Sequence, residues 1–214
     1  MQKKWRKRKK TRARTTGLYV HIATHQSMLP WGHAAFGYLL YSLYSRHAVG
    51  RPPVGLSVFA LGFGTQFPDL IDKPLSWTVS ILPYGRSLSH SLFTLILLVG
   101  VLWVLFQYPD QRALTTAFGI GYLSHVIGDG IGPAITGDYV GLGYLLWPLT
   151  PVPTGDSRSF IEFFLTLELT PQVFAGLILA VISILVWVYD GMPGIKDLLF
   201  ESEPAQDPPV SDDL

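Results

Sequence analysis

Residues 91–109 read SLFTLILLVGVLWVLFQYP, a run of 19 positions without a charged side chain. Residues 171–189 (PQVFAGLILAVISILVWVY) form a second uncharged run of the same length. As a helix, about 20 apolar residues cross the ~30 Å hydrocarbon core of a membrane. Tyr108, Trp187 and Tyr189 lie near the ends of these runs, where an interfacial aromatic belt would place them. The two runs therefore predict an integral membrane protein built from helices.

Three shorter apolar segments, residues 34–45, 54–67 and 113–127, flank and connect the two long runs. Each is short for a span, and the alternative is a buried helix of a soluble protein. Because they connect strong spans, we expect them to cross as well, which predicts an all-α bundle of about five transmembrane helices. Small residues would let two of these helices approach closely; they are Gly62, Gly64, Gly119 and Gly121.

The composition of the chain excludes several classes of protein. Charged residues make up 14% of the 214 positions, with a net charge of +1, against roughly 25% charged residues in a soluble domain. The apolar content excludes a wholly disordered chain, and the absence of cysteine excludes a disulfide scaffold. Any metal site must therefore use His, Asp or Glu side chains.

Charge is unevenly distributed along the chain. Nine of the 16 basic residues fall within the first 14 positions, whereas acidic residues dominate after Lys196. We expect a basic, disordered N-terminal extension (1–27), a transmembrane domain (28–196) and an acidic, disordered tail (197–214). Met28 opens MLPWGHAAFG and is an alternative start. If residues 1–27 are native, the positive-inside rule places the adjoining end of the bundle in the cytoplasm, beneath the plasma or inner membrane.

Ionisable side chains at the ends of the apolar segments are the main functional signal, because they are costly inside a membrane. They occur in WGH, FPDLIDKP, GRSLSHS and GYLSHVIGDG. In an up-and-down bundle, all four places meet at one membrane face. The candidates are His33, Asp69, Asp72, Arg86, His90, His125 and Asp129.

Local spacing supports a shared site. His125 and Asp129 are four residues apart, so both side chains point the same way on a helix. The aspartates of FPDLIDKP are three apart, and its two prolines favour a turn over a regular helix. Each candidate also has a structural explanation, such as a helix cap, a hydrogen bond across the bundle, or an ion pair between Lys73 and a nearby aspartate.

Histidines and carboxylates that converge without thiolates are typical of a divalent metal site, with Zn favoured and Mn or Fe as alternatives. A divalent ion with an open position lowers the pKa of bound water toward neutrality and so generates a nucleophile. Asp72 would then be a further ligand or the general base, and Arg86 would orient a phosphate or another anion. The expected metal ligands are His33, Asp69, His90, His125 and Asp129.

A set of motifs carries a family resemblance over about residues 28–150. They are the Gly32 and His33 pair, the Pro68 and Asp69 pair, RSLSHS at 86–91, GYLSHVIGD at 121–129, and WP within LLWPL at 145–149. In order and spacing the set resembles the YdjM-like family of membrane-bound metal-dependent hydrolases. The resemblance implies a hydrolase-like domain over residues 28–196.

The chain departs from the family pattern at two motifs. Where the family has PDIDH, this chain has Ile71 in place of the second aspartate, Asp72 one position later, and Lys73 near the histidine position. Gly85 replaces the first histidine of HRGxTHS. Three alternatives follow: recruitment of Asp72, a site for one metal rather than two, or loss of activity.

The sequence leaves three functions open. The first is a membrane-bound hydrolase whose metal-activated water attacks an ester or phosphoester of a lipid or small molecule at the membrane surface. The second is a non-enzymatic transporter of ions or protons, which needs polar groups along a path through the membrane. The third is a scaffold that contacts membrane lipids through its basic arm. Specific nucleic-acid binding is not expected, because the arm contains one aromatic residue, Trp5, and no recognition motif.

Overall fold

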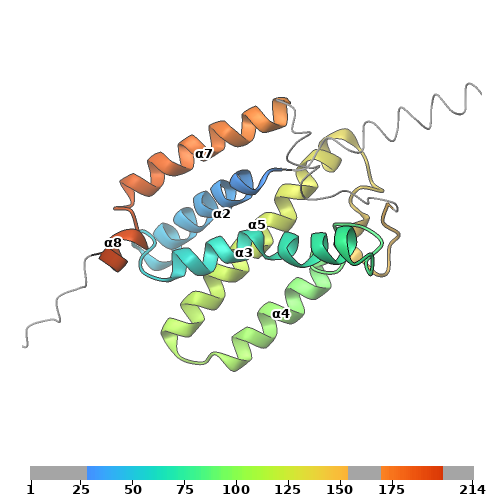
Figure 1. The fold of residues 1–214 in the computed structure, drawn as a ribbon. Helices are drawn as coiled ribbons and strands as arrows, with labels where there is room; N and C mark the ends of the chain where they lie inside the picture. Colours follow the sequence, from blue (N-terminus) through green and yellow to red (C-terminus); the bar gives the residue numbers. More distant parts are fainter. Residues whose placement is uncertain (1–27, 154–169, 200–214) are drawn as a thin grey trace, which may run out of the picture.

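The computed structural model describes residues 28–153 and 170–199, and within them all regular structure is helical. The predictions for residues 1–27, and for the tail from residue 200 onward, lie outside the described residues. Five longer helices build the fold (Figure 1): α2 (Pro30–Tyr44), α3 (Ser57–Lys73), α4 (Leu92–Leu105), α5 (Pro109–Thr136) and α7 (Pro171–Tyr189). Short helical segments connect them or follow them: η1 (Ser45–Val49), η2 (Pro74–Thr78), η3 (Gly143–Leu146) and α8 (Ile195–Leu199). The predicted all-α fold is confirmed.

Local sequence signals explain where these helices begin and end. Proline occupies the first helical position of α2, α5 and α7, where its missing N–H would have no partner in the helix. The side chain of Ser91 accepts a hydrogen bond from the Phe93 N–H and caps α4, and Thr170 caps α7 in the same way. Helix α5 ends at Gly137, whose φ of 70° is in the left-handed region that favours glycine.

Helix α5 is the centre of the bundle and packs against α2, α3 and α4, whereas α7 packs on α2 at the outside (Figure 1). Glycines allow α3 and α5 to approach closely. A Cβ atom at Gly121 would lie 2.3 Å from the Leu61 carbonyl oxygen, and one at Gly64 would lie 2.3 Å from that of Phe118. The prediction of close approach is right for these two glycines. A Cβ at Gly62 would meet nothing, so that glycine has no packing role.

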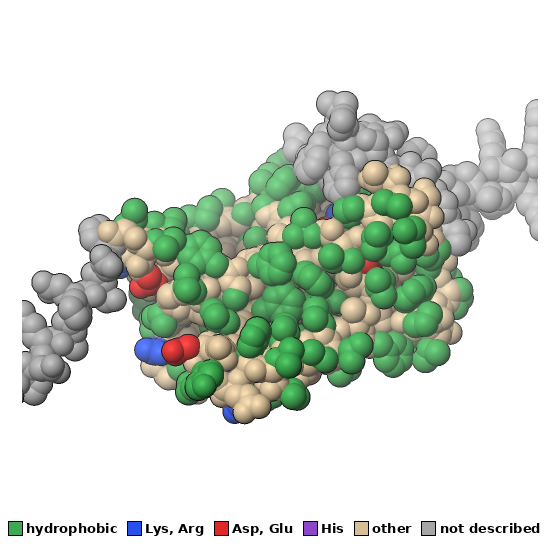
Figure 2. All heavy atoms as spheres, turned by 60° about the horizontal axis from the view of Figure 1, so that its bottom comes forward, with side chains coloured by type: hydrophobic (Ala, Val, Ile, Leu, Met, Phe, Trp, Pro, Cys, Tyr) green, Lys and Arg blue, Asp and Glu red, His purple; other side chains and the backbone are tan. Residues whose placement is uncertain are grey.

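The distribution of polarity is the reverse of that in a soluble domain. Buried polar or charged residues outnumber buried hydrophobic ones in the described residues. Meanwhile α4 has no buried residue at all, and its leucines and valines form much of an apolar surface (Figure 2). Large exposed apolar patches mark surfaces that contact something other than water.

The five segments predicted to span a membrane all lie in helices, but they differ in length and hydropathy. Among the described residues, only α7 is both long and apolar enough to cross a membrane, with a mean hydropathy of 2.3 and 17% of its span window buried. Helix α4 is apolar but has 14 residues, because the chain turns extended at Phe106. Length and composition therefore support one membrane span. They do not establish the predicted bundle of about five spans.

The turn predicted at FPDLIDKP is wrong. Helix α3 continues through Pro68 to Lys73, and a π-helical turn follows from Pro74. Proline inside a helix removes one backbone hydrogen bond and disfavours the helix by about 3 kcal/mol. Extensive packing of α3 against α5 offsets this effect. Both aspartates of the motif therefore extend from the last turns of a regular helix.

Candidate metal centre

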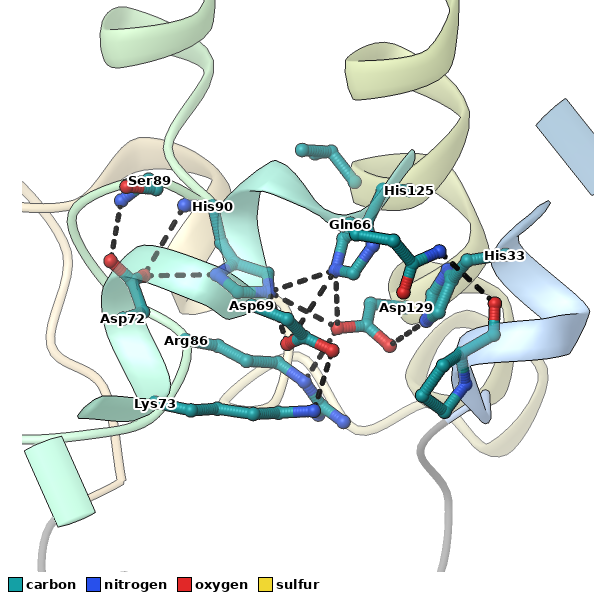
Figure 3. A network of polar contacts seen from close by, with 12 residues as sticks. His33, Gln66, Asp69, Asp72, Lys73, Arg86, Ser89, His90, His125 and Asp129 are labelled. Atoms are coloured by element: carbon teal, nitrogen blue, oxygen red, sulfur yellow. Dashed lines mark hydrogen bonds and ion pairs between the residues drawn. The ribbon is translucent and has the colours of Figure 1, made fainter. Parts of the chain in front are cut away.

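Four side chains from three parts of the chain meet at one end of the bundle (Figure 3). Asp69 comes from α3, His90 from the loop before α4, and His125 and Asp129 from α5. Each offers one ligand atom, and these atoms all lie within 4.8 Å of one another. All four residues are buried, with exposed fractions between 0% and 8%. The predicted convergence of these residues is what the structure shows.

The two histidines are held with their Nε2 atoms toward each other. His125 Nδ1 lies 2.7 Å from the Thr65 carbonyl oxygen, which can only accept, so Nδ1 carries a proton and Nε2 a lone pair. His90 Nδ1 lies 2.9 Å from the Asp72 carboxylate and is assigned the same tautomer. The two Nε2 atoms are 3.1 Å apart. Two lone pairs facing each other at this distance require a proton or a cation near them.

The two carboxylates of the cluster leave oxygens without a hydrogen-bond donor. Asp69 Oδ1 and Asp129 Oδ1 are buried, and neither has a hydrogen-bond partner within residues 28–153 and 170–199. Asp69 Oδ1 lies 3.5 Å from His90 Nε2 and 3.7 Å from His125 Nε2. Buried carboxylate oxygens without partners are unfavourable. The donor set of two imidazole nitrogens and two carboxylate oxygens therefore fits a divalent cation.

The charges around the cluster also call for a cation. Lys73 Nζ lies 2.5 Å from Asp69 Oδ2, and Arg86 Nε lies 2.7 Å from Asp129 Oδ2. With Asp72, three carboxylates face two basic side chains, which leaves one negative charge. Burial opposes a charged His90, but hydrogen bonds to the Asp129, Asp69 and Asp72 carboxylates outweigh burial and raise the pKa of His90 to about 10. A metal ion would displace that proton.

Asp72 lies outside the four-residue group, on the far side of the His90 ring (Figure 3). Its carboxylate accepts hydrogen bonds from the Ser87 and Ser89 N–H groups at 2.7 and 2.8 Å, besides the bond from His90. This carboxylate orients a histidine whose other nitrogen faces the cluster, an arrangement common around metal ions in proteins. The geometry places Asp72 behind His90, outside the four candidate ligands, and its expected role as a further ligand or general base stays a prediction.

His33 borders the four-residue group without belonging to it. Its ring stacks on that of His125 with 3.8 Å between centroids, and its Nε2 lies 3.4 Å from Asp129 Oδ1. Its Nδ1 is buried and has no hydrogen-bond partner in the part of the chain that the structure describes. His33 therefore reaches the site, as expected, but its position is beside the ligand set.

Sequence reasoning missed three contributors to the site. The Thr65 carbonyl fixes the His125 tautomer, and Tyr144 places its ring edge-on to His90, with 5.9 Å between centroids. Tyr144 in turn donates a hydrogen bond to the Val126 carbonyl. Gly128 is the third: a Cβ there would lie 3.2 Å from His33 Nδ1. A carbonyl has no sequence signal, and tyrosine and glycine are too common in this chain to single out.

A helical bundle with an apolar exterior and a buried His/Asp cluster at one end defines a membrane-associated protein with a candidate metal centre. The model of the YdjM inner membrane protein family matches residues 28–193, more than half of the chain. The chain therefore belongs to the YdjM inner membrane protein family, as its motifs predicted. Neither the curated proteins nor the solved structures gave a match.

Proposed function

We propose that this protein is a multi-pass inner-membrane hydrolase that binds a divalent metal ion and cleaves ester or phosphoester bonds. The observation that carries the proposal is the pair of facing Nε2 atoms at 3.1 Å. They are flanked by Asp69 Oδ1, which has no hydrogen-bond partner among the described residues, and by Asp129 Oδ2, which is paired with Arg86.

The multi-pass arrangement is supported by the polarity of the helices. Exposed apolar side chains cover α4 and α7 and also occur on α3 and α5, for example Phe63 at 55% and Ile135 at 80% exposure. Water would be an unfavourable solvent for this surface, whereas lipid would suit it. Helices of 14 to 28 residues would then cross together as one bundle.

The donor set supports zinc as the ion. Asp69, His90, His125 and Asp129 offer two nitrogen and two oxygen ligands, a set that zinc accepts readily and that Mn or Fe can also use. A divalent ion bound there supplies Lewis acidity and lowers the pKa of water. A Zn, Mn or Fe ion bound by these residues would be held away from bulk solvent.

The remaining side chains have separable roles. The Arg86 guanidinium has five N–H donors, and its Nε bonds to Asp129, which fixes a positive group beside the cluster. Together with the Lys73 ammonium it supplies the charge that binds an anionic substrate or product. His33 Nε2 lies 3.4 Å from Asp129 Oδ1, which positions this ring to relay a proton at the site.

The test combines metal analysis with an activity panel. Protein purified in detergent should contain about one equivalent of a divalent metal. His125→Ala should lose that metal, and His47→Ala, which changes an exposed histidine at the other end of the bundle, should retain it. The metal-loaded protein should cleave at least one member of a panel of carboxylic esters and phosphoesters.

Two results would overturn the proposal. One is metal content that His125→Ala leaves unchanged. The other is metal-dependent ion flux in proteoliposomes without any hydrolysis, which would instead support a transporter.

A further inference from the structure

A cavity of about 460 Å³ lies between the C-terminal half of α5 and the N-terminal half of α7. Helix α2 packs against both of these helices, and the cavity lies where α5 and α7 face each other. Its size is within the ~300–1,000 Å³ range of small-molecule sites. Its apolar wall is formed mainly by Met28, Ile131, Ile135, Ala175 and Leu179.

The lining is chemically suited to a hydrocarbon. None of the lining residues is charged, and Thr136 and Gln172 are the only ones with a polar side chain. Ile135 and Ala175 are exposed although they line the cavity, so it opens on the apolar exterior of the bundle. An apolar cavity that opens toward lipid would admit an alkyl chain directly from the membrane.

The cavity borders the candidate metal centre. Gly128 lines it and directly precedes Asp129 on α5. A Cβ at Gly128 would lie 3.2 Å from His33 Nδ1, so this glycine lies between the cavity and that buried nitrogen. His33 is 1% exposed, and its Nδ1 has no hydrogen-bond partner among the described residues. The apolar cavity and the polar cluster are therefore neighbours at this level of α5.

We propose that this cavity holds the hydrocarbon chain of a lipid substrate whose ester or phosphoester group lies at the candidate metal centre. The proposal rests on the hydrolase function proposed above and names its substrate class. An alkyl-chain substrate would account for a buried polar cluster that lies beside an apolar cavity. The lining orients the chain, and the basic side chains at the cluster hold the anionic end.

Photolabelling tests the cavity without requiring turnover. The probe is dodecyl phosphonate with a diazirine at the end of its chain, applied to the metal-loaded, full-length protein. Labels should map to residues 128–136 and 171–179, and unlabelled dodecyl phosphonate should compete at least ten-fold better than methyl phosphonate. Ala175→Phe should reduce labelling at least ten-fold because it fills the cavity. Ala134→Phe, an exposed alanine on α5 outside the lining, is the matched control.

A second variant and a second readout keep the proposal falsifiable. If Ala175→Phe does not fold, Ile135→Trp blocks the same cavity from a position that is 80% exposed. In the hydrolysis assay, kcat/KM should rise about four-fold per methylene of the substrate until the cavity is full. Labels spread evenly over the outer faces of α4 and α7, or equal labelling of Ala175→Phe and Ala134→Phe, would overturn the proposal.

Labels that reach the cavity only after deletion of residues 1–27 would instead assign the cavity to that segment, and the proposal would be wrong. Hydrolysis and labelling can fail separately. Specific labelling in a protein that hydrolyses nothing would refute the hydrolase but support the alkyl-chain site. Hydrolysis that does not depend on the length of the substrate chain would support the hydrolase but refute the alkyl-chain site.

Discussion

The substitution Asp72→Asn tests whether Asp72 positions a metal ligand or is itself a metal ligand. The Asp72 carboxylate is fully buried and accepts from Ser87 N, Ser89 N and His90 Nδ1 at 2.7, 2.8 and 2.9 Å. Asparagine has one acceptor oxygen and one amide nitrogen. If the oxygen keeps the bonds to Ser87 and His90, the amide NH₂ faces the N–H of Ser89, and that buried donor loses its partner.

The expected effect has two parts. One unpaired buried N–H lowers the free energy of unfolding by about 1–3 kcal/mol. Loss of the charge-assisted bond to His90 weakens zinc binding by about 10–100-fold, the usual effect of changing a residue that orients a metal-bound histidine. All four candidate ligands remain in place, so zinc is still bound. Asp69→Asn, in contrast, should abolish stoichiometric zinc.

The assay is competition with a chromophoric chelator for zinc on purified protein, with denaturant unfolding measured in parallel. Asp110→Asn, an exposed aspartate in the first turn of α5, is the control and should match the wild type in zinc affinity. Unchanged zinc affinity in Asp72→Asn would refute the positioning role. A loss as complete as that in Asp69→Asn would show that Asp72 is itself a ligand.

Three further predictions concern packing, pH and charge. Gly121→Ala should lower the free energy of unfolding by about 1–3 kcal/mol because its Cβ meets backbone, whereas Gly62→Ala should leave it unchanged or raise it slightly in unfolding titrations. Burial alone would raise the pKa of Asp190, but hydrogen bonds from Ser42, Tyr38 and Arg46 outweigh it and lower that pKa. A lowered folded-state pKa gives stability that is present above about pH 4 and lost as pH falls through the folded value. In acid-unfolding titrations, Asp190→Asn should therefore remove this part of the pH dependence. Arg86→Lys should retain zinc by elemental analysis but reduce turnover of any phosphoester substrate about 100-fold, because the guanidinium fork is lost.

Much of the site could be predicted from sequence because its residues lie at helix ends. In an up-and-down bundle, the start of one helix and the end of the next lie at the same end of the bundle. Polar motifs at the start of the first and third helices and at the end of the second and fourth therefore converge, whatever the details of packing. The i, i+4 spacing of His125 and Asp129 likewise fixes a common direction. These arguments need only the number of helices between the motifs.

What could not be predicted depends on tertiary packing. Pro68 favours a turn by local rules, yet packing of α3 on α5 keeps the helix intact. Asp69 and Asp72 look equivalent three residues apart, but they face opposite sides of His90, and only one of them meets the cluster. Hydropathy also does not decide whether an apolar helix shorter than about 20 residues crosses the membrane. Its position in the bilayer depends on its tilt and on the neighbouring helices.

One structural feature joins the stability of the bundle to the chemistry of its site. Helices α3 and α5 meet through residues spaced by four on each: Leu61 opposite Gly121, Thr65 opposite His125, and Asp69 in the ligand set with Asp129. At the first level a Cβ on Gly121 would lie 2.3 Å from the Leu61 carbonyl oxygen, and at the second a carbonyl holds a histidine at 2.7 Å. The contacts at these successive levels hold the two helices close together along this stretch. The glycine contact therefore sets the spacing at which the two carboxylates can share one ion, and its loss should weaken metal binding along with the fold.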